Sequence, residues 1–195
     1  SKHTEALEGI KELFRNAGIG YELSFKMLNA SDYNVPQDRK RVFFIGIRKD
    51  LDFKYQFPTE TFPKITLESA ISDLKEGVLP ALEYNNTNGE NCVLPNHEYM
   101  IGSFSSIFMS RNRVRSWDEQ SYTIQAGGRH APIHPQAPKM KFIEQNIRVF
   151  VPGKEHLYRR LSVRECARIQ TFPNDFIFHY KKVAAGYKMI GNAVP

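Results

Sequence analysis

Three polar side chains occupy alternate positions in a short stretch of the chain: Gln37, Arg39 and Arg41. Pro36 disfavours helix for the residue before it, so we expect the stretch to be extended. In extended backbone, side chains two residues apart point to the same side. An amide and two guanidiniums on one face would suit carboxylates, phosphates or the carbonyl edge of a base. A solvated basic strand edge explains the same pattern, and this stretch alone does not separate the two interpretations.

A second group of arginines, Arg111, Arg113 and Arg115, also recurs at every other residue. It lies between two runs of β-like composition, residues 99–109 and residues 122–126. An extended ribbon of this kind can lie in the major groove of DNA and present its guanidiniums to guanine. A solvated, arginine-rich hairpin is the alternative that the segment leaves open.

Glycines mark two further places of interest. Gly127 and Gly128 precede Arg129, and glycine there would let the backbone approach a partner closely. Near the end of the sequence, Gly191 and Asn192 predict a turn with accessible backbone.

The periodicity of the chain indicates an α/β protein. Residues 4–17 carry apolar side chains at helical spacing, and residues 21–27 alternate apolar with polar side chains as a strand does. Residues 42–47 are almost all apolar, which predicts a strand covered on both faces. A short helix is predicted over residues 66–74. The first elements lack a Gly-rich strand-to-helix turn, so the chain is expected to start in the middle of a fold.

The second half contains a well-formed helix start. Ser162 can cap the helix, and Glu165 at its third position can close a capping box. Leu161 and Cys166 can form the hydrophobic contact that often accompanies such a box. We therefore expect Cys166 to be a core residue and not a nucleophile.

Charge is unevenly distributed over the 195 residues, which together carry a net charge of +6. Residues 1–49 carry nine basic and six acidic side chains, and residues 50–100 carry three basic and nine acidic ones. Residues 101–195 carry fifteen basic and six acidic side chains. The last half is therefore where a polyanion such as a nucleic acid is expected to bind.

Several classes of protein are disfavoured. No apolar run approaches the roughly 18 residues that span a membrane, so no membrane partner is expected. Cys92 and Cys166 are far apart and do not predict a disulfide framework, which favours a reducing, intracellular compartment. His97 lacks a second histidine at helical spacing, so no metal site is predicted.

Three stretches together resemble the DNA (cytosine-5) methyltransferase family. Residues 36–42, residues 160–173 and residues 191–194 match the eighth, ninth and tenth motifs of that family in order. The variable region between the first two resembles the family's target-recognition segment. Within it, residues 107–115 and 134–138 look like those of bacterial modification methylases that act on GGCC.

The resemblance implies an enzyme that flips a cytosine out of double-stranded DNA and transfers a methyl group to it from S-adenosylmethionine. By position, Arg41 would contact the flipped cytosine, and Gln37 and Arg39 would hold that cluster in place. Asn192 and Val194 would lie beside the cofactor. A further set of residues would contact DNA: Ile107, Arg111, Arg113, Arg115, Thr123 and Arg129.

The sequence also departs from the family pattern. The family's cofactor glycine motif, its Pro-Cys catalytic loop and its Glu-Asn-Val motif precede the eighth motif, and these 195 residues contain none of them. Neither Cys92 nor Cys166 follows a proline. We therefore expect the chain to be inactive alone and to need the N-terminal half of the same enzyme or a complementing chain. A non-catalytic DNA-binding specificity subunit is the alternative.

The expected architecture follows from the same resemblance. It is a partial Rossmann-like methyltransferase sheet domain with a small target-recognition domain made mostly of strands and loops. Residues 1–49 and 159–195 would belong to the catalytic domain, and residues 50–158 would form the target-recognition domain. The expected location is the bacterial cytoplasm.

Overall fold

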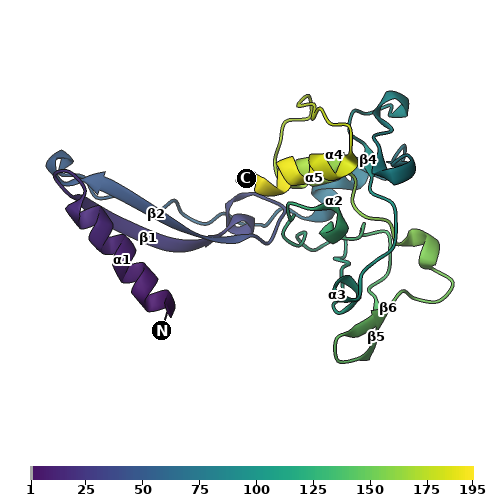
Figure 1. The fold of residues 1–195 in the computed structure, drawn as a ribbon, viewed down its shortest axis with the longest axis horizontal. Coiled ribbons are helices and arrows are strands. Elements are labelled where there is room, and N and C mark those ends of the chain that lie inside the picture. Colours follow the sequence, from purple (N-terminus) through teal and green to yellow (C-terminus); the bar gives the residue numbers. More distant parts are fainter. Residues whose placement is uncertain (1) are drawn as a thin grey trace. The chain divides into compact units, whose positions relative to one another are not determined.

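The computed structural model describes residues 2–195, with the side chains of residues 4–195. It divides into two compact units (Figure 1). The first comprises Ser1–Asn29 and Lys40–Thr61, and the second comprises Ala30–Arg39 and Phe62–Pro195. The predicted division into a catalytic domain of residues 1–49 and 159–195 and a target-recognition domain of residues 50–158 concerns function, and it remains a prediction.

The first unit is a helix and a two-stranded antiparallel sheet. Helix α1 (Lys2–Asn16) precedes strands β1 (Tyr21–Asn29) and β2 (Lys40–Arg48), which confirms the helix and both strands expected from periodicity. The two strands pair from Tyr21 with Arg48 to Asn29 with Lys40. A Cβ at Gly46 would lie 2.5 Å from the Phe14 ring, so glycine lets the helix approach the sheet closely.

The prediction that residues 42–47 are covered on both faces is wrong for the described part of the chain. Val42 is 45% exposed and Phe43 is 36% exposed. The reason is that β2 pairs with β1 alone among the described strands, and one helix cannot cover both faces of a sheet.

The second unit has two hydrophobic cores. Helices α2 (Leu67–Ile71), α4 (Val163–Ile169) and α5 (Val183–Asn192) contribute to the larger one, beside the short parallel strands β3 (Leu79–Pro80) and β4 (Glu98–Tyr99). The smaller one lies near helix α3 (Ser106–Met109) and the hairpin of β5 (Lys141–Glu144) and β6 (Ile147–Val149). The described residues thus form a mixed α/β fold whose three sheets have two strands each.

Two predicted helix starts are confirmed. Thr66 caps α2 by accepting a hydrogen bond from the Ser69 amide, and a 3-10 turn continues the helix to Leu74. Ser162 and Glu165 form the complete capping box of α4. Cys166 is fully buried in the larger core, and burial raises the pKa of its thiol, so the expected core role is confirmed.

The two β-like runs flanking the arginines are not strands. Only Glu98–Tyr99 is extended in a ladder at the first run, which then turns into α3 because Ser105 accepts a hydrogen bond from the Phe108 amide. Residues 122–126 form no strand, since the neighbouring bridge is a single pair between Gln37 and Ser121.

The predicted turn at Gly191 is also wrong, because Gly191 is buried in the last turn of α5. A Cβ there would lie 2.3 to 2.4 Å from backbone atoms of Gln125 and Ala126, so glycine permits a close helix–backbone contact. Gly128 likewise approaches residues of this chain: a Cβ would lie 2.6 Å from Met100 Sδ.

None of the helices in the described residues is long and apolar enough to cross a membrane. The same described residues contain no group of three or more His, Cys, Asp or Glu side chains placed to hold a metal ion.

Candidate nucleic-acid interface and the network behind it

Gln37 and Arg39 are buried in the second unit and use their side chains inside it. The Gln37 amide donates to Gln170 Oε1, and its oxygen accepts from the Ile124 amide at 2.8 Å. Arg39 donates to the carbonyl of Ile124 at 3.0 Å. The segment around residue 37 is therefore fixed to α4 and to residues 121–124.

The same network includes the end of the sequence. Arg39 donates to the carbonyls of Gly191 at 3.0 Å and Ala193 at 3.2 Å, and Gln170 donates to Ala193 at 2.7 Å. A guanidinium at the C-terminus of α5 also meets the negative end of the helix dipole. The three stretches that carry the family resemblance are thus joined by buried hydrogen bonds.

Arg41 has a different environment from Gln37 and Arg39. It belongs to the first unit, is exposed, and donates to the carbonyl of Lys40 at 2.7 Å. Its guanidinium is accessible to a ligand, whereas the guanidinium of Arg39 is enclosed by backbone.

Arg113 holds the end of α3. Its Nε donates to Phe108 O at 2.8 Å and its Nη2 donates to Ile107 O at 2.9 Å, with the guanidinium 5.0 Å from the centre of the Phe108 ring. Burial lowers the pKa of Arg113, and the nearby charge of Arg111 lowers it further. This clamp fixes the helix turn from which Ile107 projects, 71% exposed, into solvent.

Arg115 is paired within the chain. It donates to Asp38 and to Glu119, each at 3.0 Å, and lies 4.3 Å from the centre of the Tyr122 ring. A backbone hydrogen bond from Ser116, with those from Arg115 and Lys139, holds the pKa of Glu119 at about 2. The Arg115 guanidinium is therefore already paired with two carboxylates.

Arg111 differs from its two neighbours in the loop. Its side chain is exposed, and it makes no hydrogen bond with any part of the chain that the structure describes. The three arginines do not form one uniform face: Arg113 and Arg115 brace the loop, and Arg111 presents its guanidinium to solvent.

The remaining residues predicted to contact DNA or the cofactor also lie in the second unit. Thr123 Oγ1 donates to Asp38 O at 2.6 Å, which ties it to the segment of Gln37. Arg129 is exposed and lines a cavity of about 400 Å³. Asn192 and Val194 are both exposed at the end of α5.

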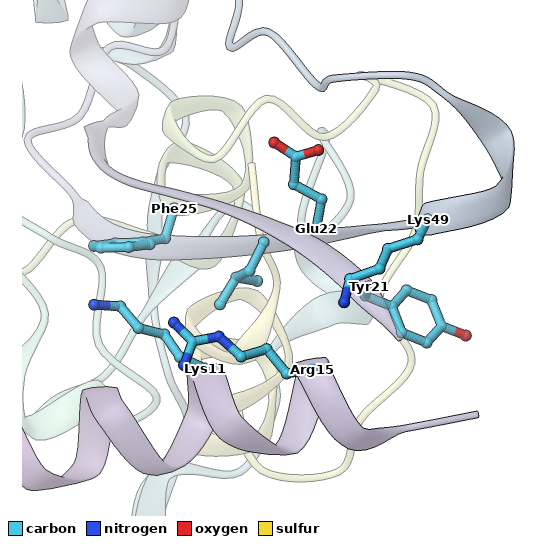
Figure 2. Close-up of a pocket in the computed structure, with 7 residues that line it drawn as sticks. Lys11, Arg15, Tyr21, Glu22, Phe25 and Lys49 are labelled. Carbon is cyan, nitrogen blue, oxygen red and sulfur yellow. The ribbon is translucent and has the colours of Figure 1, made fainter. Parts of the chain in front are cut away.

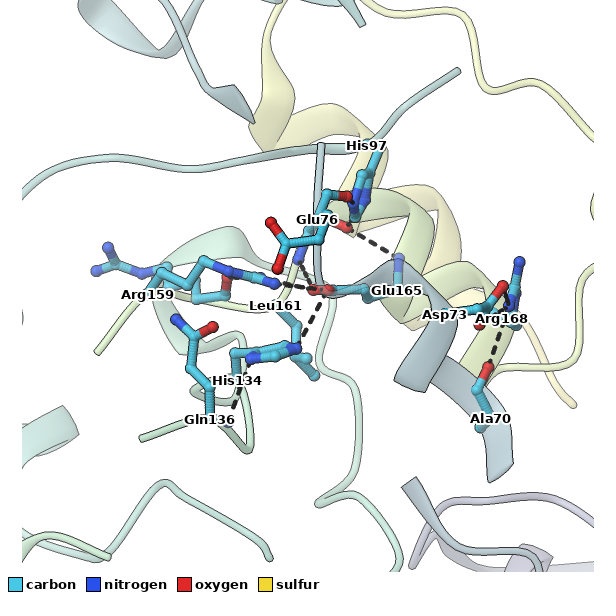
Figure 3. Close-up of polar contacts among 12 residues, drawn as sticks. Ala70, Asp73, Glu76, His97, His134, Gln136, Arg159, Leu161, Glu165 and Arg168 are labelled. Atoms are coloured by element: carbon cyan, nitrogen blue, oxygen red, sulfur yellow. Dashed lines mark hydrogen bonds and ion pairs between the residues drawn. The ribbon is translucent and has the colours of Figure 1, made fainter. Parts of the chain in front are cut away.

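The sequence predicted Glu165 only as a helix-capping residue, and the structure shows that it is also the centre of a buried ion-pair cluster. Glu165 is fully buried, accepts two hydrogen bonds from Arg159 at 2.7 and 2.8 Å, and accepts a third from the Ser162 amide (Figure 3). Burial alone would raise the pKa of Glu165, but the Arg159 hydrogen bonds and charge lower it overall. The capping box pointed to Glu165, whereas no sequence spacing pointed to Arg159.

His134 completes this cluster. Its ring is fully buried, with Nε2 3.4 Å from Glu165 Oε1 and Nδ1 accepting from the Gln136 amide at 3.2 Å (Figure 3). Burial lowers the pKa of His134 to about 4. The imidazole is therefore neutral at pH 7, and because Nδ1 accepts a hydrogen bond, its proton is on Nε2, which makes no hydrogen bond within the described residues.

The first unit has a cavity of its own, of about 510 Å³ (Figure 2). Lys11 and Arg15 reach it from α1, Tyr21 and Glu22 from β1, and Lys49 from the residues after β2. None of the site residues predicted from sequence lines it.

The family described as C-5 cytosine-specific DNA methylase matches residues 1–195. The chain belongs to this family. Gln37, Arg39 and Gln170 join the stretches that we predicted from sequence to be motifs of this family.

Individual relatives are type II methyltransferases. M.MthTI of Methanothermobacter thermautotrophicus is 64% identical over 177 residues, which cover 91% of this chain and 53% of that protein. M.FnuDI of Fusobacterium nucleatum is 51% identical over 100% of this chain and 57% of its own length. The chain thus spans about half the length of these relatives.

Solved structures share the fold. A prophage-encoded protein of E. coli, described as a DNA modification methyltransferase, has a TM-score of 0.62 at 19% identity and matches 100% of this chain and 61% of its own. The Dnmt2 methyltransferase of S. pombe has a TM-score of 0.53 at 15% identity, over 99% of this chain and 58% of its own. The mixed α/β fold therefore corresponds to part of a DNA methylase.

Proposed function

We propose that this chain is the DNA-recognition portion of a type II DNA cytosine-5 methyltransferase of a restriction-modification system, and that it selects GGCC in double-stranded DNA. The observation that carries the proposal is the buried network of Gln37, Arg39 and Gln170. It supports a single rigid frame for the three family motifs, beside a loop whose Arg111 remains available. Rigid frames with exposed arginines are what base reading requires.

We call residues 107–115 the recognition loop, and its side chains have different roles. Arg111 presents its guanidinium to the major groove, where a fork of donors matches O6 and N7 of guanine. Ile107 fills the space that the flipped cytosine leaves. Arg113 and Arg115 set the shape of the loop through their internal bonds and approach DNA from there. Thr123, held by Asp38, supports the target strand.

The cytosine pocket needs groups from outside these residues. Arg41 donates to the carbonyl oxygen of the flipped cytosine, where charge develops during the reaction. The nucleophilic cysteine comes from the N-terminal half of the enzyme or from a complementing chain. The Rossmann-like sheet is completed in the same way, next to the exposed strand β2.

S-adenosylmethionine supplies the methyl group when it is bound. Asn192 offers an exposed amide and Val194 an exposed apolar surface, 69% accessible, which fits one edge of a nucleoside-containing cofactor. The described residues provide this edge alone, so the remaining contacts belong to the other half of the enzyme. Both substrates are available in the bacterial cytoplasm, where we place the protein.

Transfer of labelled methyl groups tests the proposal. The full-length protein should transfer tritium from labelled S-adenosylmethionine to a duplex with GGCC and not to a duplex of shuffled sequence. These 195 residues alone should transfer none, yet should bind DNA with an affinity that falls as salt increases. Methyl transfer by the 195 residues alone would contradict the assignment of the nucleophile. A full-length protein that binds GGCC without any transfer would support the specificity subunit instead.

A further inference from the structure

The cavity of about 400 Å³ in the second unit combines a buried cation with exposed donors. Six of the residues that line it have polar side chains: Asn85, Ser103, Ser105, Arg129, His130 and Arg160. No carboxylate is among the described residues that line it. The cavity is therefore electropositive, which favours an anionic ligand.

Arg160 supplies charge from the floor of this cavity. Only 3% of the residue is exposed, and its guanidinium donates to the carbonyls of Met100, Gly102 and Ser103 at 3.0 to 3.3 Å. Its Nε is buried without a hydrogen-bond partner among the described residues. Burial lowers the pKa of Arg160, and the charge of Arg129 lowers it further, so an anion between them would relieve an unfavourable arrangement.

The hydrogen-bonding capacity that remains at the cavity is mainly that of donors. Arg160 already donates to three carbonyls, and Asn85 Oδ1 already accepts a hydrogen bond from the Ile101 amide at 2.8 Å. The amide NH₂ of Asn85, the hydroxyl of Ser103 and the guanidinium of Arg129 are left. A base edge offers donors as well as acceptors, whereas a phosphodiester offers acceptors alone. The cavity therefore matches a phosphodiester better than a base.

The cavity lies beside the start of α3, so a phosphate bound in it would also affect the position of this helix. Ser105 lines it and also caps α3 by accepting from the Phe108 amide at 3.2 Å. The same helix carries Ile107, and Arg113 fixes its other end. A phosphate held at Ser105 would set the position of the recognition loop on the duplex, as backbone contacts do in DNA-binding proteins.

We propose that the cavity lined by Arg129, Arg160, Asn85 and Ser105 binds one phosphodiester group of the DNA and so sets the register of α3 on the duplex. The inference rests on the proposed function and assigns Arg129 to the DNA backbone instead of a base. Arg129 neutralises the phosphate directly, and Arg160 contributes its charge from below.

Binding measurements on the full-length protein test this assignment. The variants are Arg129→Gln, Arg129→Lys and, as the matched control, Lys154→Gln, which removes an exposed cation outside the cavity. Each is titrated with a GGCC duplex and a shuffled duplex over a range of salt. The GGCC duplex is also prepared as a series, each with one phosphate replaced by a neutral methylphosphonate.

We expect Arg129→Gln to weaken binding to both duplexes about three- to tenfold and to reduce the salt dependence by about one phosphate contact. Arg129→Lys should retain most of the affinity, because a point charge suffices for a phosphate but not for a bidentate base contact. One methylphosphonate should weaken the wild-type protein and leave Arg129→Gln unaffected, while Lys154→Gln still responds to it.

Three results would overturn the inference. The first is that Arg129→Gln weakens binding to the GGCC duplex but not to the shuffled duplex, and the second is that Arg129→Lys weakens binding as much as Arg129→Gln does. The third is a methylphosphonate series in which Arg129→Gln responds as the wild type does. The last would also be found if the cavity took free phosphate instead of DNA. Failure of the proposed function has a different signature, since the wild-type protein would then bind the GGCC and shuffled duplexes equally well.

Discussion

Two sets of arginines in the second unit have opposite environments. Arg159, Arg160 and Arg164 are buried, and their guanidiniums are enclosed by Glu165 and by backbone carbonyls. Arg111 and Arg129 are exposed. The excess of basic residues in the last half of the sequence led us to expect a polyanion, but part of that charge points inward. A count of charges therefore overestimates the positive surface that a polyanion can reach.

The largest effect on stability is expected at the buried set. Glu165→Gln removes the charge that Arg159 pairs with and should lower the free energy of unfolding by about 3–5 kcal/mol, because a buried cation is left uncompensated. Chemical denaturation measures it. Asp73→Asn is the control: Asp73 pairs with Arg168 but is 63% exposed, so the loss should stay below about 1 kcal/mol. Equal losses in the two variants would mean that burial of an ion pair does not determine the cost of breaking it.

Acid should weaken the same cluster through His134. Its pKa is about 4 in the folded protein and 6.5 in the reference state, so below pH 6.5 the unfolded chain binds a proton that the folded protein does not. The free energy of unfolding should fall by about 2–3 kcal/mol between pH 6.5 and 4.5 from this residue. Denaturation curves of His134→Asn should show a shallower decline over that range. His97, whose pKa burial also lowers, accounts for a remaining slope. An unchanged slope would mean that His134 does not carry the effect.

A steric change at the end of α5 should have a smaller effect. Gly191→Ala places a methyl group 2.3 to 2.4 Å from the backbone of residues 125 and 126, and overpacking of this kind costs about 1–3 kcal/mol. Gly9→Ala is the control, because a Cβ at Gly9 in α1 meets nothing within 4 Å and alanine favours helix. Thermal unfolding of the two variants should therefore shift in opposite directions.

The exposed set should show the reverse behaviour. Arg111→Ala should change the free energy of unfolding by less than about 0.5 kcal/mol, because the side chain makes no hydrogen bond within the described residues. The same change should remove about 1–3 kcal/mol of discrimination between a GGCC duplex and a duplex with one altered base pair. Binding titrations with both duplexes measure this. A uniform loss on both would make Arg111 a backbone contact.

Local sequence patterns predicted the elements that depend on local interactions. The capping box of Ser162 and Glu165 and the cap at Thr66 are formed by residues three positions apart, and both were predicted. The alternation in residues 21–27 gave the right strand for the same reason. In contrast, the run that ends at Met109 is apolar enough for a strand, and the serine cap at Ser105 makes it a helix.

The partners of the candidate site residues could not be predicted, because they lie far along the chain. Arg39 meets carbonyls at residues 191 and 193, and Arg115 meets Asp38. Gly191 shows the same limit: glycine fits either a turn or a close contact, and only the position of residues 125 and 126 decides between them. The candidate site residues were predicted from motifs, and the structure shows which of them are buried and which are exposed.

Arg39 restricts which substitutions the gene can accumulate. A single nucleotide change converts some arginine codons to lysine, and this exchange is usually tolerated at the surface. Here one planar guanidinium serves the carbonyls of Ile124, Gly191 and Ala193, which come from two separate segments. A lysine ammonium is a single point and cannot span them. The most accessible conservative mutation is therefore closed at this position, whereas Arg111, which makes no hydrogen bond within the described residues, is not restricted in this way.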